Sequence, residues 1–277
     1  MTKKVAFITG ASRGIGAETA VALAAQGWNV AITARTVAEG EAQNYTVGTT
    51  ALPGSLEATA AAVRELGGEA LCLKGDILQQ QQMIDAAQQA LAHFGRIDLL
   101  FNNAVYQGPG NQEPVLDVTD EQLQAIYQGN VFTPLALIKQ CLPAMLANGG
   151  GLVLNMLSYT AFNDPPAPAD KGGWGFAYPS SKAALGRMAG SLRVEHPDSN
   201  LRVYNIEPGT VFTEVMKAAG IDEEVMKRFK ACSPQSIAAV VAWLAENDPP
   251  EAWQPNDILR GPAIAKELGF LKLPSRL

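Results

Sequence analysis

The stretch "KVAFITGASRGIG" (residues 4–16) runs from an apolar segment directly into a glycine-rich turn. Its first six residues lack polar alternation, as expected for a strand covered on both faces. Gly10, Gly14 and Gly16 follow at the spacing GxxxGxG, and a helical pattern over 15–27 begins at once. Glycines permit a tight turn and the close approach of a pyrophosphate, while the helix N-terminus offers free N–H groups and partial positive charge. A lone glycine cluster is weak evidence, but this strand–turn–helix context predicts a dinucleotide site.

The rest of the chain repeats the alternation of strand and helix. Strand patterns cover 29–33, 69–74, 97–103, 151–157 and 201–208, and helical patterns cover 55–68, 83–95, 117–147 and the stretch that carries Tyr178. Residues 36–54 have no clear period and are predicted to be a loop. Alternation of this kind implies right-handed crossovers and a doubly wound parallel sheet, a Rossmann fold, with helices on both faces. Since no repeat or long linker divides it, we expect a single domain over 1–277.

Composition excludes several classes of function. The net charge of -6 without a basic run gives nucleic acid little to bind, and no apolar run approaches the ~18 residues of a membrane span. Cys72, Cys141 and Cys232 form no CxxC pair and are expected to be buried, reduced thiols. His93 and His196 have no ligand spacing, so no metal site is expected. A cytoplasmic protein fits these features.

The end of the second strand bears on the choice of dinucleotide. NAD sites place an acidic residue there for the ribose 2′-hydroxyl, whereas an arginine accommodates a 2′-phosphate. Here Ala34 and Arg35 occupy that place, and Arg13 lies within the glycine turn. Two guanidiniums could bind a phosphate through forked hydrogen bonds, which favours NADP(H), or they could be ordinary surface arginines. Asp76, after the third strand, is placed either to accept from an adenine amino group or to cap a helix.

Tyr178 and Lys182 in "AYPSSKAAL" (177–185) would lie one helical turn apart on the same face. Alone, the pair could be structural, with the phenol at the rim of the core and the lysine reaching water.

In combination, the motifs resemble the short-chain dehydrogenase/reductase family over about residues 4–215, with some likeness to a hydroxysteroid-dehydrogenase-like subgroup. The matching motifs are "TGASRGIG" at 9–16, "GDI" at 75–77, "NNA" at 102–104, Asn130, Ser158, "YPSSK" at 178–182 and "PGTVFT" at 208–213. Each is weak alone, but their order and spacing together are specific.

The resemblance implies a catalytic role for four residues. Tyr178 would be the general acid in ketone reduction and the general base in alcohol oxidation. Lys182, with the positive nicotinamide ring of the oxidised cofactor, would lower the pKa of that phenol, and Lys182 would also hold the nicotinamide ribose. Ser158 would donate to the substrate oxygen, and Asn130 would organise a water that links Lys182 to solvent.

Cofactor contacts follow from the same motifs and from the turn and arginines above. The expected cofactor-binding residues are Gly10, Ser12, Arg13, Gly14, Ile15, Gly16, Arg35, Asp76, Ile77, Asn103, Ala104, Tyr178, Lys182, Pro208, Gly209, Val211 and Thr213.

Structural alternatives remain for several of these residues. Ser158 could simply end its strand, although it is the only serine between 151 and 179. Asn130 could cap a local kink beside Gly129. Ser180 and Ser181 are expected to form hydrogen bonds at the helix start rather than to react.

The chain departs from the family pattern at four places. Val105 follows "NNA" where glycine is usual, Glu207 precedes "PG" where asparagine is common, and Ala161 replaces a frequent glycine. The segment "GPAIAKELGFLKLPSRL" (261–277) stands in place of a glycine-rich ending. None of these changes falls on a catalytic position, so they affect substrate type and subunit packing more than chemistry.

Two segments are candidate substrate walls. Residues 159–177 carry three prolines, three glycines and Tyr159, Phe162, Trp174 and Phe176, and residues 212–231 carry Val215, Met216, Val225, Met226 and Phe229. We expect them to close over a bulky apolar carbonyl compound. Alternatively, they pack on one another or on a neighbouring subunit.

The resulting expectation is an NADPH-dependent carbonyl reductase or alcohol dehydrogenase acting on a small-molecule carbonyl or alcohol. Related proteins usually assemble through their long helices, so a homodimer or homotetramer is expected. Two alternatives stay open at this point: a dinucleotide-sensing regulatory protein without turnover, and an epimerase or dehydratase with a tightly held cofactor.

Overall fold

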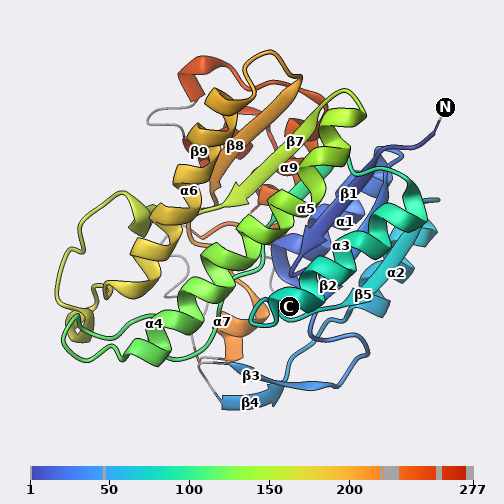
Figure 1. Ribbon diagram of the computed structural model, residues 1–277. Coiled ribbons are helices and arrows are strands. Elements are labelled where there is room, and N and C mark those ends of the chain that lie inside the picture. Colours follow the sequence, from blue (N-terminus) through green and yellow to red (C-terminus); the bar gives the residue numbers. More distant parts are fainter. Residues whose placement is uncertain (1, 46–47, 219, 221–230, 254–257, 273–277) are drawn as a thin grey trace.

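The structure is built around one sheet of seven parallel strands (Figure 1). A computed structural model describes the chain apart from residues 1, 46–47, 219, 221–230, 254–257 and 273–277. The strands are β1 (Val5–Thr9), β2 (Asn29–Ala34), β5 (Ala70–Lys74), β6 (Leu99–Asn102), β7 (Gly151–Met156), β8 (Leu201–Glu207) and β9 (Ile258–Arg260). They lie in the order β5-β2-β1-β6-β7-β8-β9, so the chain changes direction across the sheet between β1 and β6. Such a switch point is where doubly wound sheets bind ligands.

Helices cover both faces of the sheet, which confirms the predicted Rossmann fold. One face packs against α1 (Gly14–Ala25), α2 (Leu56–Glu65), α9 (Pro234–Glu246) and α10 (Gly261–Glu267), and the other against α3 (Gln80–Phe94), α5 (Thr133–Ala147) and α6 (Ala177–Glu195). The pleat of β1 sends Ile8 to the first face and Phe7 to the second, and both side chains are fully buried. A strand buried on both faces needs a continuous apolar run, which is the pattern that opens the sequence.

Three strands were missed by the sequence patterns. The predicted loop 36–54 contains an antiparallel hairpin of β3 (Ala42–Tyr45) and β4 (Gly48–Ala51), which projects beyond the sheet in Figure 1. Its strands are four residues long and mostly exposed, so they carry no apolar period. The three-residue strand β9 is likewise too short to show one.

The helical pattern over 117–147 corresponds to a helix that begins at Asp120, after a capping box formed by Thr119 and Gln122. It comprises α4 (Asp120–Tyr127), a π-helical turn η1 (Gln128–Phe132) and α5. This helix is long and apolar enough to cross a membrane, but half of its apolar window is buried within the protein. The extra residue of a π-turn re-aims side chains, and such turns are frequent at functional sites.

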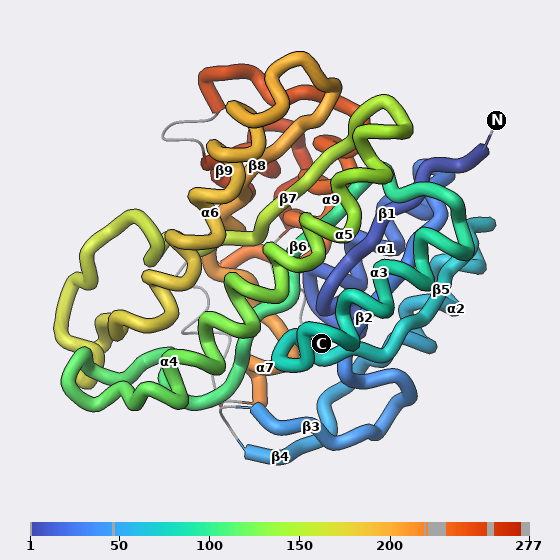
Figure 2. Tube along the Cα trace, in the orientation of Figure 1, coloured from blue at the N-terminus to red at the C-terminus, as the bar shows by residue number. Residues whose placement is uncertain are grey.

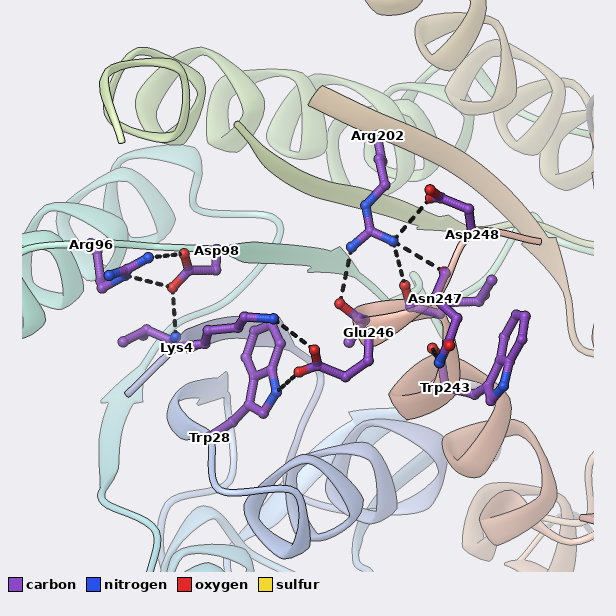
Figure 3. A network of polar contacts seen from close by, with 12 residues as sticks. Lys4, Trp28, Arg96, Asp98, Arg202, Trp243, Glu246, Asn247 and Asp248 are labelled. Atoms are coloured by element: carbon purple, nitrogen blue, oxygen red, sulfur yellow. Dashed lines mark hydrogen bonds and ion pairs between the residues drawn. The ribbon is translucent and has the colours of Figure 1, made fainter. Parts of the chain in front are cut away.

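The amino-terminal edge of the sheet is held by a polar network, drawn in Figure 3. Glu246 at the end of α9 accepts from Lys4 Nζ and from Trp28 Nε1, both at 2.7 Å. Arg202, from β8, donates to several carbonyl oxygens at the end of the same helix. These contacts stabilise the edge of the sheet at which the strands begin, opposite the edge formed by their carboxyl ends.

The three cysteines are free thiols, as predicted. Cys141 and Cys232 are buried, and burial raises their pKa values to about 12 and about 11. The expectation of burial is wrong for Cys72, which is only partly covered because it lies on the edge strand β5.

Candidate active site

A cavity of about 770 Å³ opens at the carboxyl ends of the strands. Its walls come from the turns after β1, β2, β5, β6, β7 and β8 and from the start of α6. Gly10 and Asn103 face each other across the switch point between β1 and β6, and both line it. Elements far apart in the sequence therefore meet at this position.

The glycine turn has a backbone conformation that lets a ligand group approach its N–H groups closely. Gly10 and Gly14 have φ of 68° and 59°, in the region that favours glycine. A Cβ at Gly16 would collide with the carbonyl oxygen of Gly10, so the helix can start this close to the strand only with glycine there. Asn103 Nδ2 donates to the carbonyl oxygens of Thr9 (2.8 Å) and Gly10 (3.3 Å) and thereby fixes the turn. This geometry fits the predicted pyrophosphate contact.

Nearly all predicted cofactor-binding residues share this one cavity. Its walls include Gly10, Ser12, Arg13, Gly14, Ile15, Arg35, Asp76, Ile77, Asn103, Ala104, Tyr178, Lys182, Pro208, Gly209, Val211 and Thr213. Gly16 is not on the wall but allows the turn behind it. Val105, the first departure from the family pattern, also lines the cavity.

Lys182 is buried, with 1% of its surface exposed, and its Nζ donates to the carbonyl oxygen of Met156 at 2.9 Å. The same nitrogen lies 5.9 Å from the centre of the Tyr178 ring. Burial lowers the pKa of Lys182 to about 7, because its one strong contact is to a neutral carbonyl. The predicted same-face placement of the two side chains is therefore present.

The surroundings of Tyr178 in the protein without its cofactor act against a lowered pKa. Burial raises the pKa of the phenol and outweighs a hydrogen bond with Ser158 that lowers it, while the negative charge of Glu207 raises it further. Desolvation dominates here, since Lys182 is itself desolvated and only partly charged near neutral pH. The predicted lowering of this pKa involves Lys182 together with the oxidised nicotinamide ring, and it stays a prediction.

Ser158 serves two purposes. It precedes the short 3-10 helix η2 (Tyr159–Ala161), and its Oγ accepts from the Thr160 N–H at 3.3 Å, so it does end its strand as a local cap. The same hydroxyl forms a hydrogen bond with Thr160 Oγ1 at 3.0 Å and lies close enough to Tyr178 to lower the pKa of the phenol. The serine thus lies beside the phenol with which it was predicted to act.

Asn130 is fully buried in the π-turn, the site at which the sequence suggested a kink. Its Oδ1 accepts from the Tyr106 N–H at 2.9 Å, and its Nδ2 donates to Ser181 Oγ at 3.0 Å. Ser180 and Ser181 donate to the carbonyl oxygens of Ala177 and Tyr178, as predicted for residues of a helix start. Among the described residues, Asn130 forms no hydrogen bond with Lys182 itself, and its bond to α6 is to Ser181, the residue before Lys182.

Asp76 and the two arginines are engaged with the chain itself. Asp76 Oδ1 accepts from the Leu78 N–H at 2.9 Å, which caps a turn before α3 rather than the helix, whose N-cap is Gln79. Arg35 Nη2 donates to the carbonyl oxygen of Asn44 at 3.1 Å. Arg13 forms hydrogen bonds with the segment that follows the hairpin and with Tyr45.

The candidate substrate segments differ from each other. In 159–177 the rings of Tyr159 and Trp174 pack edge to face, 6.3 Å apart, and Phe162 and Phe176 are exposed. This segment runs beside the green connection before α4 in Figure 2, with Gly175 packed against the carbonyl oxygen of Glu113. None of its side chains lies on the cavity wall, and of its four aromatic rings Tyr159 and Trp174 contact each other.

The second segment reaches the cavity through α7 (Glu214–Ala218). Val215 and Met216 line the wall. The remaining predicted residues of this segment, Val225, Met226 and Phe229, lie outside the described residues.

Sequence reasoning missed three residues near the site. Asn44 and Tyr45 of the hairpin line the cavity, and a tyrosine within an otherwise small, polar segment was the available signal. Glu207 is buried, and its Oε1 accepts from the Gly209 N–H at 2.7 Å. Burial raises the pKa of this carboxyl, and its hydrogen bonds with the Gly209 and Tyr159 N–H groups oppose that shift. The Glu207 carboxylate thus contacts the backbone of the loops after both β7 and β8. The sequence around Glu207 gave no signal for this role.

Known proteins share this arrangement of motifs and fold. A family model described as short chain dehydrogenase matches residues 4–224. The chain belongs to the short-chain dehydrogenase family. The 7alpha-hydroxysteroid dehydrogenase of Escherichia coli (strain K12) is 29% identical to this dehydrogenase over 262 residues, 92% of this chain and 91% of that protein.

Solved structures of similar proteins carry either dinucleotide. A metagenomic short-chain oxidoreductase in complex with NADP has 30% identity and a TM-score of 0.68, covering 88% of this dehydrogenase and 91% of that chain. A 7 alpha-hydroxysteroid dehydrogenase complexed with NADH and 7-oxo glycochenodeoxycholic acid has 28% identity and a TM-score of 0.73, covering 93% and 92%. The family therefore establishes an oxidoreductase that binds a nicotinamide dinucleotide.

Proposed function

We propose that this protein is an NADP(H)-dependent oxidoreductase that interconverts a carbonyl group and an alcohol on an apolar small molecule. The observation that carries the proposal is the placement of Ser158 beside Tyr178 at the cavity, close enough to lower the pKa of the phenol, with Lys182 one turn further along α6. Two hydroxyls that meet in this way can both point at one substrate oxygen. A bound nicotinamide dinucleotide supplies the hydride chemistry.

Each side chain then has a defined task. Tyr178 gives its proton to the carbonyl oxygen during reduction and takes it back during oxidation. Ser158 donates to the same oxygen as negative charge develops on it. Lys182, when protonated, favours the phenolate form of Tyr178, and its bond to the Met156 carbonyl holds the ammonium in place. Asn130 positions the first turn of α6 through Ser181.

The preference for NADP(H) rests on Arg35. This arginine stands at the end of β2, on the cavity wall, where an NAD site would place an acid. A guanidinium there stabilises a 2′-phosphate and offers no acceptor to a 2′-hydroxyl. The relative bound to NADP is consistent with this preference, whereas the relative bound to NADH is a reason to measure it.

An apolar substrate is supported by the wall around the catalytic pair. Val105, Leu157, Val215 and Met216 all line the cavity that Tyr178 and Lys182 also line. A relative that holds a steroid ketone, 7-oxo glycochenodeoxycholic acid, supports bulky alicyclic ketones as the first class to test.

Assembly into a homodimer or homotetramer is supported by apolar side chains on and before the long helix. Leu116 is 96% exposed, and Phe132 and Leu135 are also accessible along η1 and α5. Light scattering of the purified protein measures the assembly directly.

The test of the proposed function is a panel of ketones, aldehydes and alcohols, each measured with NADPH and NADH by nicotinamide absorbance. We expect turnover of at least one apolar ketone, with a higher kcat/KM for NADPH than for NADH. Absence of turnover across the panel, with dinucleotide binding intact, contradicts the oxidoreductase assignment of the catalytic residues. A higher kcat/KM for NADH contradicts only the assignment of Arg35.

A further inference from the structure

Arg13 is bonded to the protein through all three of its guanidinium nitrogens. Its Nε donates to the carbonyl oxygen of Pro53 at 2.9 Å. Its Nη2 donates to the carbonyl oxygens of Leu52 and Gly54 at 3.2 and 2.7 Å. Its Nη1 donates to the hydroxyl of Tyr45 at 2.7 Å. Because the guanidinium of Arg13 donates to this many acceptors within the protein, we interpret it as a residue that stabilises the local structure rather than as one that binds a phosphate.

All but one of its partners belong to the β3–β4 hairpin or to the residues directly after it; the exception is Thr36, whose Oγ1 accepts from Nη2 at 3.4 Å. Gly54, with φ of 97°, packs so closely on the glycine turn that a Cβ there would lie 2.6 Å from the Ser12 carbonyl oxygen. Its N–H donates to the carboxylate of Glu39, on the other side of the hairpin. Arg13 therefore ties this hairpin, which the sequence patterns missed, to the glycine turn.

Tyr45 connects the hairpin to the second arginine. Its side chain is buried, and its ring lies 5.3 Å from the Arg35 guanidinium carbon and 6.0 Å from that of Arg13. Arg35 has a single hydrogen bond among the described residues, from Nη2 to the Asn44 carbonyl oxygen at 3.1 Å. Arg35 is thus oriented by hairpin residues while it keeps donors for a ligand in the cavity that it lines.

We propose that Arg13 is a positioning residue that fixes the β3–β4 hairpin, and that this hairpin orients Arg35 as the residue that recognises the 2′-phosphate of the dinucleotide. The inference rests on the proposed preference for NADP(H) and assigns the discrimination to one arginine and one hairpin. A direct bond from Arg13 to the 2′-phosphate is the competing arrangement.

Two small ligands isolate the recognition from catalysis. Adenosine 2′,5′-bisphosphate and 5′-AMP differ only in the 2′-phosphate, so the ratio of their dissociation constants, measured by calorimetry, reports that contact alone. A charge-assisted contact of this kind is worth roughly 10–100-fold in affinity. We expect that ratio in the unmodified protein and a ratio close to one in Arg35→Ala.

A double-mutant cycle separates positioning from direct contact. Because Ala42 and Ala51 are paired across the hairpin, residues 43–50 can be replaced by Asn-Gly, a two-residue turn that joins paired strands. We expect this shortened protein to lose most of the discrimination although both arginines are present. Arg13→Ala should lower the ratio in the full-length chain and cause no further loss in the shortened one.

A ligand-free measurement accompanies the cycle. Chymotrypsin should cleave after Tyr45 faster in Arg13→Ala, because the buried ring loses its anchor, and Tyr45→Phe should show a smaller increase. Arg64→Ala is the matched control, since that arginine donates to a carbonyl oxygen, of Ala70, outside the cavity. It should change neither the ratio nor the cleavage rate.

The outcomes distinguish the inference from the proposed function. If Arg13→Ala lowers the ratio by the same factor in both backgrounds, or if shortening leaves the ratio unchanged, the inference is overturned and the NADP(H) preference stands. A ratio near one in the unmodified protein overturns the preference, and the inference with it.

Discussion

Lys182 places its ammonium nitrogen 5.9 Å from the centre of the Tyr178 ring and 2.9 Å from the carbonyl oxygen of Met156. Burial removes water from this amine and lowers its pKa to about 7, and the carbonyl group that it contacts carries no negative charge to oppose that shift. The positive charge of Lys182, which would assist Tyr178, is therefore lost near neutral pH in the folded protein.

Replacing the phenol should abolish proton transfer without disturbing the fold. Tyr178→Phe removes one hydroxyl and keeps the ring, so we expect kcat to fall by ~10²–10⁴-fold, as is typical when a general acid is lost. Dinucleotide affinity should change little. Tyr159→Phe is the control, because its exposed ring lies in the loop after β7. A Tyr178→Phe enzyme with kcat near that of the unmodified protein would show that another group moves the proton.

The buried amine should also cost stability. In the unfolded chain Lys182 keeps its proton to about its ordinary pKa of 10.5, whereas the folded chain releases it near 7. The stability of the unmodified protein therefore rises with pH between these values. We expect Lys182→Met to be inactive and more stable at pH 7 by about 2–4 kcal/mol, reduced by ~1 kcal/mol for the lost bond to Met156.

Chemical denaturation from pH 7 to 10 measures this effect. The stability advantage of Lys182→Met should shrink as the pH rises, because both states of the unmodified protein approach the neutral amine. A difference that stays constant over this range would mean that Lys182 is not desolvated.

Glu207 should set the pH dependence of the reaction through its charge. The ionised carboxyl raises the pKa of Tyr178, so Glu207→Gln should lower that pKa. The acidic limb of the kcat/KM profile for alcohol oxidation should then move to lower pH. Glutamine can still accept from the Gly209 N–H, and Glu207→Asp, which retains the charge, is the control. An unmoved limb in Glu207→Gln, with folding intact, would exclude this coupling.

Substrate size should be sensed by Met216 rather than by the aromatic loop. Met216 lines the cavity, whereas Trp174 packs against Tyr159 away from it. We expect Met216→Ala to raise KM for bulky apolar ketones roughly 10-fold, a loss of ~1–1.5 kcal/mol of burial, and to leave KM for small ketones nearly unchanged. Trp174→Ala should affect large and small ketones alike. The reverse pattern would make residues 159–177 the substrate wall.

The elements predicted well from the sequence are those in which one pattern had one structural solution. The apolar run before Gly10 could be satisfied only by a strand buried on both faces, and the glycine spacing only by a turn into a helix. The hairpin at 42–51 escaped because its strands are short and exposed, and because its anchor, Arg13, lies in another motif. Long-range contacts of that kind leave no local period in the sequence.

At the candidate active site, the sequence predicted which residues come together, but it did not predict the direction of the Tyr178 pKa shift. The motif spacing brought Tyr178, Lys182 and Ser158 to one place, as expected. The direction of the Tyr178 pKa depends on how much water the fold removes and on Glu207, and neither is visible in a spacing of four residues. The π-turn that holds Asn130 was visible only as a helical pattern.

The packing of α1 on α9 has a consequence for how the protein is made. The apolar side of α1, which includes Ala20, Leu23 and Ala24, is buried with Val240, Val241 and Leu244 of a helix near the other end of the chain. During synthesis α1 is made before α9, so the side of α1 that faces α9 has no cover until α9 is made, although the sheet and α2 already cover other parts of the helix. A nascent chain, or one truncated before α9, would therefore expose an apolar stripe of α1 directly after the glycine turn, where it could associate with other apolar surfaces.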